Sequence, residues 1–250
     1  MYIDAHNHLL RAVPADGARF FAARAEWQLV NSVDAGDWET LAGLAGARAG
    51  EVFPFFGIHP WAKDAPGGWE SALEKILTEC LRNPAIPGVG IGETGLDRRK
   101  STLPLPAQAA RLRPQLELAR CFRIPVTLHC LGAAQELYAA LYPEFSGLSV
   151  LLHAFGGGIP EAKRFIDQGA FFSFSAAGFA PGRQRARELL AYVPDDRLLL
   201  ETDATDAPPD IRETYRQAAA LRRTPPEALA AQLRRNAEDF LGVRPPTVTR

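Results

Sequence analysis

Cysteine is scarce in this sequence, and neither sign of charge is in excess. The three cysteines, Cys80, Cys121 and Cys130, are scattered and form no CxxC pair. This spacing argues against a disulfide framework and a thiolate zinc site and suggests a reducing compartment. Twenty-eight basic residues oppose 29 acidic ones, for a net charge of −1. A protein that coats nucleic acid without sequence preference is normally far more basic, so composition gives no argument for DNA binding, although a local basic patch would still serve.

Long hydrophobic runs are missing as well. No apolar run approaches the roughly 20 residues of a membrane-spanning helix. The first residues, Met1 to Asp4, show neither the basic nor the apolar segment of a signal peptide. We therefore expect a cytoplasmic protein that does not span a membrane, and no feature of the sequence points to an obligate protein partner.

Short β-rich runs alternate along the chain with longer stretches rich in Ala, Leu, Glu and Arg. Eight such units predict an α/β fold in which a parallel sheet closes into a (β/α)8 TIM barrel, with residues 1–250 forming a single domain. An open doubly wound sheet is the alternative, but no GxGxxG follows the first strand. Ile211–Leu241 predicts two helices separated by prolines, and the tail Arg244–Arg250 is expected to be extended. The predicted strands are Tyr2–His6, Trp27–Val33, Val52–Ile58, Gly88–Glu93, Pro125–His129, Ser149–His153, Ala170–Phe174 and Leu198–Asp203.

All the histidines of the chain fall at or just beyond the end of a predicted strand: His6, His8, His59, His129 and His153. Two carboxylates, Glu93 and Asp203, end predicted strands in the same way. In a barrel these strand ends meet at one rim, where active sites lie. Imidazole and carboxylate together are ligands for Zn, Mn, Fe or, with more oxygens, Mg. The pattern therefore predicts a divalent-metal site at the rim.

The residues of this set differ in what they can do. His6 and His8 are two apart on one strand, so both can bind one cation; a pair of exposed turn histidines is the plainer alternative. Asp4 lies on the same face and is expected to orient an imidazole. Glu93 stands among glycines that leave room for an ion, and a carboxylate can bridge two cations. Asp203 can bind a metal and accept a proton from water.

Several neighbours of the rim have more than one interpretation. Asp97 lies beyond the fourth predicted strand, where it is a candidate for capping a loop. Trp61 and Phe155 either stack on a base or pack. The run 98–100 is either a phosphate clamp or a solvated group of charges, and the glycines at 156–158 either offer N–H groups to a phosphate or form a turn.

The order of these motifs resembles the TatD family of metal-dependent hydrolases. The family's DxHxH, GIHP, GExGLD, a strand ending in His, HxFxG and ETD occur in that order at Asp4–His8, Gly57–Pro60, Gly92–Asp97, Val126–His129, His153–Gly157 and Glu201–Asp203. The motifs extend over nearly the whole chain, and six in order are highly specific.

The resemblance implies two divalent ions with six ligands: His6, His8 and Asp203 for one ion, His129 and His153 for the other, and Glu93 as the bridge. It makes Asp203, Glu93 and His59 the catalytic residues, with His59 facing the substrate or its phosphate. The implied activity is that of a phosphodiesterase, a deoxyribonuclease with DNA as its substrate. The metal remains open among Zn, Mg, Mn and Fe. The alternative is hydrolysis of another ester, a lactone, an amide or a small phosphoester, which the same rim supports.

The sequence departs from the family where a phosphate would be held. Relatives commonly carry an arginine two residues after the histidine of strand five, and Leu131 stands there in this chain. An aromatic pair after GLD is replaced by Arg98 and Arg99. Two readings follow: either Arg98 binds the substrate and restores the missing charge, or the pocket has lost phosphate affinity and prefers a less charged ester or amide.

Overall fold

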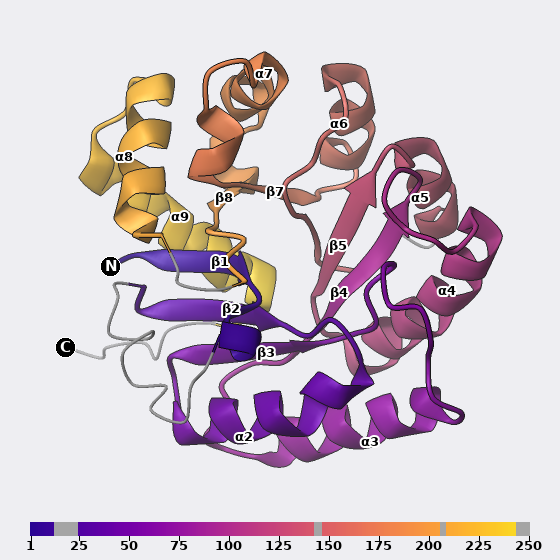
Figure 1. Cartoon of the computed structure of the whole chain (residues 1–250). Coiled ribbons are helices and arrows are strands. Elements are labelled where there is room, and N and C mark those ends of the chain that lie inside the picture. Colours follow the sequence, from indigo (N-terminus) through magenta and orange to yellow (C-terminus); the bar gives the residue numbers. More distant parts are fainter. Residues whose placement is uncertain (13–24, 143–146, 206–208, 244–250) are drawn as a thin grey trace.

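The fold is an eight-stranded parallel barrel surrounded by helices (Figure 1). The computed structural model describes residues 1–12, 25–142, 147–205 and 209–243, so the predicted extended tail lies outside the described residues. The strands pair in sequential order, and two hydrogen bonds beyond β8 join it to β1, from Asp203 N to His6 O (3.0 Å) and from His8 N to Ala204 O (2.8 Å). The predicted TIM barrel is therefore confirmed. The strands are β1 (Ile3–Asn7), β2 (Trp27–Asn31), β3 (Val52–Phe56), β4 (Gly90–Asp97), β5 (Val126–Leu131), β6 (Val150–Leu152), β7 (Phe171–Phe174) and β8 (Leu198–Leu200).

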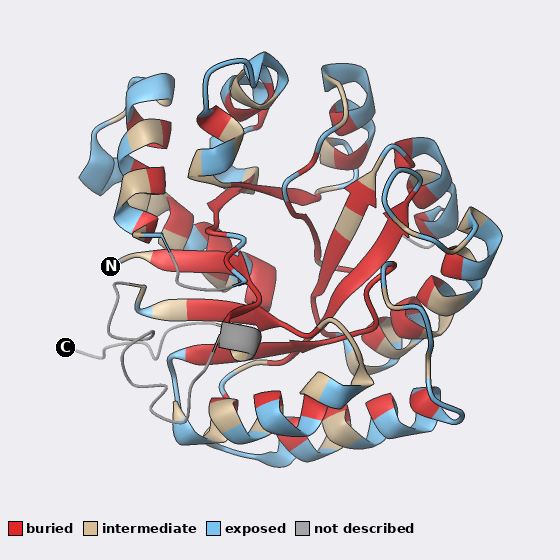
Figure 2. Ribbon diagram, in the orientation of Figure 1, coloured by how far each residue is buried: buried red, intermediate tan, exposed pale blue. Residues whose placement is uncertain are grey.

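Helices follow the strands and pack outside them, with exposed faces turned outward and buried strands within (Figure 2). In the described part of the chain, none of them has the length and apolar character needed to cross a membrane. The α-helices are α2 (Trp38–Ala47), α3 (Trp69–Arg82), α4 (Leu105–Phe122), α5 (Ala134–Leu141), α6 (Ile159–Ile166), α7 (Gln184–Tyr192), α8 (Ile211–Arg222) and α9 (Pro226–Leu241). Short 3-10 helices are η1 (Leu9–Ala12), η2 (Ala35–Asp37), η3 (Ala176–Phe179) and η4 (Asp195–Arg197).

An apolar layer lies near the amino ends of the strands and closes that side of the barrel. Phe240 of α9 is fully buried there, stacks on Phe55 with ring centroids 5.9 Å apart, and meets the edge of Phe171. Its carbonyl oxygen accepts a hydrogen bond from Ser149, just before β6. The polar rim therefore lies at the opposite, carboxyl ends of the strands.

Most strand ends differ from the predicted ones by one to four residues, and two of these differences concern carboxylates of the predicted site. The fourth strand was expected to end at Glu93, but β4 continues to Asp97 because its partner β5 also continues, and the two pair as far as Asp97 and Leu131. The eighth strand was expected to reach Asp203, but β8 ends at Leu200 and Asp203 lies in the following loop.

Candidate metal centre

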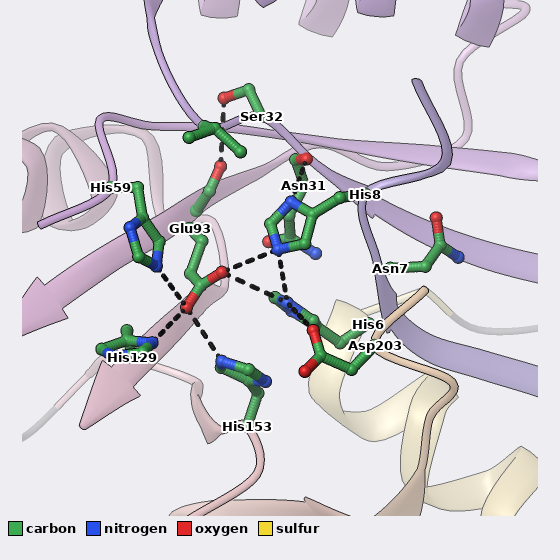
Figure 3. A network of polar contacts seen from close by, with 12 residues as sticks. His6, Asn7, His8, Asn31, Ser32, His59, Glu93, His129, His153 and Asp203 are labelled. Carbon is green, nitrogen blue, oxygen red and sulfur yellow. Dashed lines mark hydrogen bonds and ion pairs between the residues drawn. The ribbon is translucent and has the colours of Figure 1, made fainter. Parts of the chain in front are cut away.

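Glu93 lies at the centre of the rim and contacts all five histidines (Figure 3). Its side chain is 1% exposed. The two carboxylate oxygens face different groups: Oε2 lies 2.9 Å from His8 Nε2 and 3.3 Å from His6 Nε2, whereas Oε1 lies 2.8 Å from His129 Nδ1, 2.8 Å from His153 Nε2 and 3.1 Å from His59 Nε2. The barrel thus brings together side chains that are far apart in the sequence.

Asp203 is the seventh predicted residue and joins the cluster beside β1. Its Oδ1 lies 3.8 Å from His6 Nε2, and its side chain is 42% exposed. The Nε2 atoms of His6 and His8 are 3.1 Å apart, so the two imidazoles and the Asp203 carboxylate have ligand atoms close enough to hold one cation. Burial and the nearby carboxylates raise the pKa of Asp203 above its usual range.

Close approach of β4 to β5 places Glu93 beside His129. Gly95 has a φ of +144°, and a Cβ at this position would lie 2.1 Å from the backbone oxygen of His129. Contacts under about 3 Å do not occur for real Cβ atoms, so only glycine fits. The GExGLD pattern therefore has a steric cause at this position.

The hydrogen bonds of two histidines fix which ring nitrogen carries the proton. His8 Nδ1 lies 2.9 Å from the backbone oxygen of Asn31, which can only accept, so the neutral ring turns the lone pair of Nε2 toward Glu93. His59 has the opposite arrangement, because its Nδ1 accepts from the backbone N–H of Trp61 (3.0 Å). Neutral His59 therefore presents an Nε2–H donor to the centre. His8 is suited to bind a cation through Nε2 and His59 to donate to an anionic oxygen.

Two further carboxylates stand behind the histidines that face Oε1, and sequence reasoning gave neither of them this role. Asp97 Oδ2 lies 3.0 Å from His129 Nε2, and Glu201 Oε1 lies 3.5 Å from His153 Nδ1. Asp97 also accepts from two backbone N–H groups of the following loop, so the predicted capping role is confirmed. Asp97 belongs to the GExGLD motif and Glu201 to the ETD motif, so the motifs were the signal from which their role near the histidines could have been predicted.

Asp4 does not orient an imidazole, and that expectation was wrong. Its carboxylate accepts hydrogen bonds from the backbone N–H (2.9 Å) and hydroxyl (2.6 Å) of Thr202 and from the side chain of Asn7 (3.1 Å). Because β1 lies beside β8, Asp4 reaches the residue before Asp203. It therefore fixes the loop that carries Asp203.

The cluster keeps Glu93 ionised. Burial by itself would raise the pKa of Glu93, but electrostatic interaction with His153 and His59 and hydrogen bonds from His129 and His153 hold that pKa well below its usual range. Desolvation lowers the pKa of His6, which is fully buried. A buried carboxylate that stays charged among imidazole nitrogens is an electrostatic environment that favours a cation.

Arg98 lies at the edge of the rim and is held from outside the cluster. Its Nε donates to Gly132 O (3.0 Å), and its guanidinium pairs with Glu136 in the first turn of α5. Trp61 is 43% exposed, donates from its indole N–H to Asp97 Oδ2 (2.5 Å), and has the ammonium of Lys100 5.0 Å from its ring centre. The positive charge expected from residues 98–100 is thus present at the rim. The Arg98 guanidinium already contacts Glu136, and the Lys100 ammonium already lies over the ring of Trp61.

Two other candidates near β6, Phe155 and Gly158, already have partners within the fold. Phe155 is 2% exposed and packs edge-on against Phe165 and Phe172. The N–H of Gly158 donates to Glu161 Oε2 at the start of α6 (2.7 Å). Packing is therefore the correct interpretation for Phe155, and the Gly158 N–H is already bonded.

Comparison with known proteins agrees with the motifs. The family model for TatD related DNase matches residues 3–242. A protein of Erwinia billingiae named 3′-5′ ssDNA/RNA exonuclease TatD is 32% identical over 228 residues, which cover 84% of this chain and 85% of that protein. The protein of the same name from Salmonella typhimurium is 28% identical over 191 residues, covering 75% of this chain and 70% of that protein.

A solved structure shares the fold. The crystal structure of a TatD homologue from Escherichia coli K12 matches with a TM-score of 0.82 and 23% identity, covering 97% of this chain and 98% of that one. The match of the family model over nearly the whole chain and the identity to the Erwinia protein together establish the relationship. The chain belongs to the family of TatD related DNases.

Proposed function

We propose that the chain is a nuclease that hydrolyses phosphodiester bonds of DNA with two divalent cations bound around Glu93. As a member of the TatD related DNases, the chain is a hydrolase that acts on phosphodiester bonds. The number of cations, their ligands and the nucleic-acid substrate are the proposal. The relatives named as single-stranded DNA and RNA exonucleases support a single-stranded nucleic acid.

The division of the Glu93 carboxylate carries the proposal. Oε2 faces the Nε2 atoms of His6 and His8, and Oε1 faces His129, His153 and His59. A carboxylate whose two oxygens face separate sets of nitrogen donors fits a bridge between two cations. This division agrees with the assignment that the resemblance implies. It gives His6, His8 and Asp203 to one ion, and His129 and His153 to the other.

Bound cations would polarise a phosphoryl oxygen and lower the pKa of water. The residues of this chain then supply the proton transfer and the hydrogen bonds. Asp203 is exposed enough to meet water at the mouth and would accept its proton as a general base. His59 would donate its Nε2–H to the substrate phosphate, because its Nδ1 is occupied by the Trp61 N–H. The tautomer explains why His59 is a substrate residue although it contacts Glu93.

A reconstitution experiment tests this function. Chelator-treated protein would be assayed with Zn²⁺, Mg²⁺ or Mn²⁺ on single-stranded DNA, an aryl phosphodiester and an aryl ester. We expect activity on the two phosphodiesters that returns only with metal, in protein whose circular dichroism is unchanged by chelation. Turnover that is unaffected by chelation, or confined to the ester, would contradict the proposal.

One observation favours the second candidate, a hydrolase of less charged esters or amides. The guanidinium expected to replace the family's phosphate-binding arginine is bound to Glu136 and Gly132 O, and Leu131 stands at the family position. If Arg98 keeps these partners during catalysis, the pocket lacks that charge. The same substrate panel separates the two candidates.

A further inference from the structure

The two halves of the centre differ in what stands behind their imidazoles. On the Oε1 side, each of His129 and His153 has a carboxylate near the ring nitrogen that faces away from Glu93. On the Oε2 side, the group behind His8 is a neutral carbonyl oxygen. Within the described part of the chain, His6 Nδ1 and His153 Nδ1 are both buried without a hydrogen-bond partner, but His153 Nδ1 has a carboxylate oxygen 3.5 Å away. The asymmetry bears on how strongly each half can hold a cation.

Asp97 is held rigidly behind His129. Besides His129, it accepts hydrogen bonds from the indole of Trp61 (2.5 Å) and from the backbone N–H groups of Arg99 (2.6 Å) and Lys100 (2.8 Å). With N–H donors on both of its oxygens, the Asp97 carboxylate is an acceptor, and its Oδ2 faces Nε2 of His129 (3.0 Å). The Nε2 proton therefore points to Asp97, which leaves Nδ1 of His129 for a cation on the Glu93 side.

Glu201 stands behind His153 at a longer distance. Its side chain is fully buried, and Oε2 accepts from the hydroxyl of Ser173 on β7. Oε1 lies 3.5 Å from His153 Nδ1, and in the described part of the chain both atoms are buried without a hydrogen-bond partner. Oε1 and Nδ1 therefore face each other, which directs Nε2 of His153 toward Glu93.

The Oε2 side has weaker support. His8 is oriented by the Asn31 carbonyl, which carries no net charge. The side chain of Asp203 is 42% exposed, so water competes with a cation for its carboxylate. A carboxylate behind a histidine ligand fixes the ring and raises its basicity, and loss of such a partner typically lowers metal affinity 10- to 100-fold.

We infer that the two cations bind with unequal affinity, and that Asp97 and Glu201 are positioning residues that make the position beside Glu93 Oε1 the tighter one. This inference rests on the proposed two-ion centre. The position beside Oε2, with His6, His8 and Asp203, is then the one that fills last and empties first.

Calorimetric titration of the metal-free full chain with Mn²⁺ tests the inference. The wild type should bind two ions in events separated by at least about tenfold in Kd. Repulsion between two dications would also separate the events, so ligand variants must assign them. His8→Ala should keep one event near the tight wild-type Kd, whereas His129→Ala should keep one weak event.

The positioning residues are tested by variants that keep every ligand. Asp97→Asn and Glu201→Gln should each weaken the tight event about 10- to 100-fold and leave the weak event near its wild-type value. With one equivalent of Co²⁺, the shifted imidazole N–H resonance of His129 should change in Asp97→Asn while that of His153 is retained. Glu136→Gln, a carboxylate on α5 that pairs with Arg98, is the matched control and should leave both events unchanged.

The failures of the two proposals are distinguishable. A total of one Mn²⁺ per chain would overturn the two-ion centre and this inference with it. If two ions bind but the tight event is lost in His8→Ala and kept in His129→Ala, the inference alone is overturned. The same holds if Asp97→Asn weakens both binding events equally. Circular dichroism and the Tm of the metal-free variants establish that each is folded.

Discussion

Glu93→Gln keeps the shape of the side chain and removes the charge that both halves of the metal centre share. The structure gives each carboxylate oxygen its own group of histidines. Asp203, by contrast, lies close to His6 and His8 only on one side. Glu93→Gln should therefore weaken both positions, and Asp203→Asn should weaken one.

The size of the effect follows from binding linkage. An ion that binds only the folded state stabilises it by about 2.7 kcal/mol at 100 times its Kd, so two ions contribute about 5 kcal/mol or more. A tenfold loss of affinity at one position removes about 1.4 kcal/mol. The expected loss is about 3 kcal/mol for Glu93→Gln and about half of that for Asp203→Asn. For a chain of 250 residues, these losses correspond to roughly 6–11 °C and 3–6 °C in Tm.

The measurement is the difference in Tm between metal-loaded and chelated protein, taken for the wild type and each variant by circular dichroism. Using this difference removes any effect of the substitution on the metal-free fold. Glu136→Gln should show the full wild-type difference. If Glu93→Gln loses no more of the metal-dependent Tm increase than Asp203→Asn does, Glu93 does not bridge two ions.

Three further predictions concern the base, the rim arginine and the fold. Asp203→Asn should lower kcat roughly 10²- to 10⁴-fold, the usual cost of removing a general base; near-normal turnover would remove Asp203 from the mechanism. Arg98→Ala should weaken the binding of phosphodiester substrates about 10- to 150-fold without changing ester hydrolysis. Glu136→Ala, which frees the guanidinium, should not weaken that binding. If Arg98→Ala keeps the wild-type KM and kcat on phosphodiesters, Arg98 has no role in phosphate binding. Gly95→Ala should destabilise the fold by about 2–5 kcal/mol through backbone strain and overpacking, because its Cβ would lie 2.1 Å from a backbone oxygen of β5. Gly43→Ala, on an exposed helix face with no atom within 4 Å of the new Cβ, should stabilise it by about 0.5–1 kcal/mol; denaturant unfolding that ranks the two variants otherwise would contradict the steric argument.

The sequence by itself was sufficient for the barrel and for the residues gathered at its rim. Strand periodicity and the apolar runs before His129 and His153 are local signals, and parallel strands bring their carboxyl ends to one edge whatever the details of packing. Composition did not indicate nucleic-acid binding, because a net charge of −1 does not show which side chains gather at the rim.

Strand ends were the first point that local pattern could not fix. Glu93 was expected to end the fourth strand, but pairing with β5 extends β4 to Asp97. One of the two readings of the sequence had Arg98 bind the substrate, and its guanidinium has partners on α5 and after β5. A strand's length and a long side chain's direction depend on neighbours that a sequence pattern does not name.

The hydrogen bonds of the imidazoles were decided by the tertiary structure alone. Asp97 lies 32 residues before His129, and Asp4 reaches Thr202 across 198 residues of sequence. The sequence shows that histidine is present at the rim, but the proton on each ring belongs to whichever nitrogen faces an acceptor. His8 and His59 have the same side chain and the same placement near a strand end. One presents a lone pair and the other an N–H only because the fold sets a carbonyl oxygen behind the first and a backbone N–H behind the second.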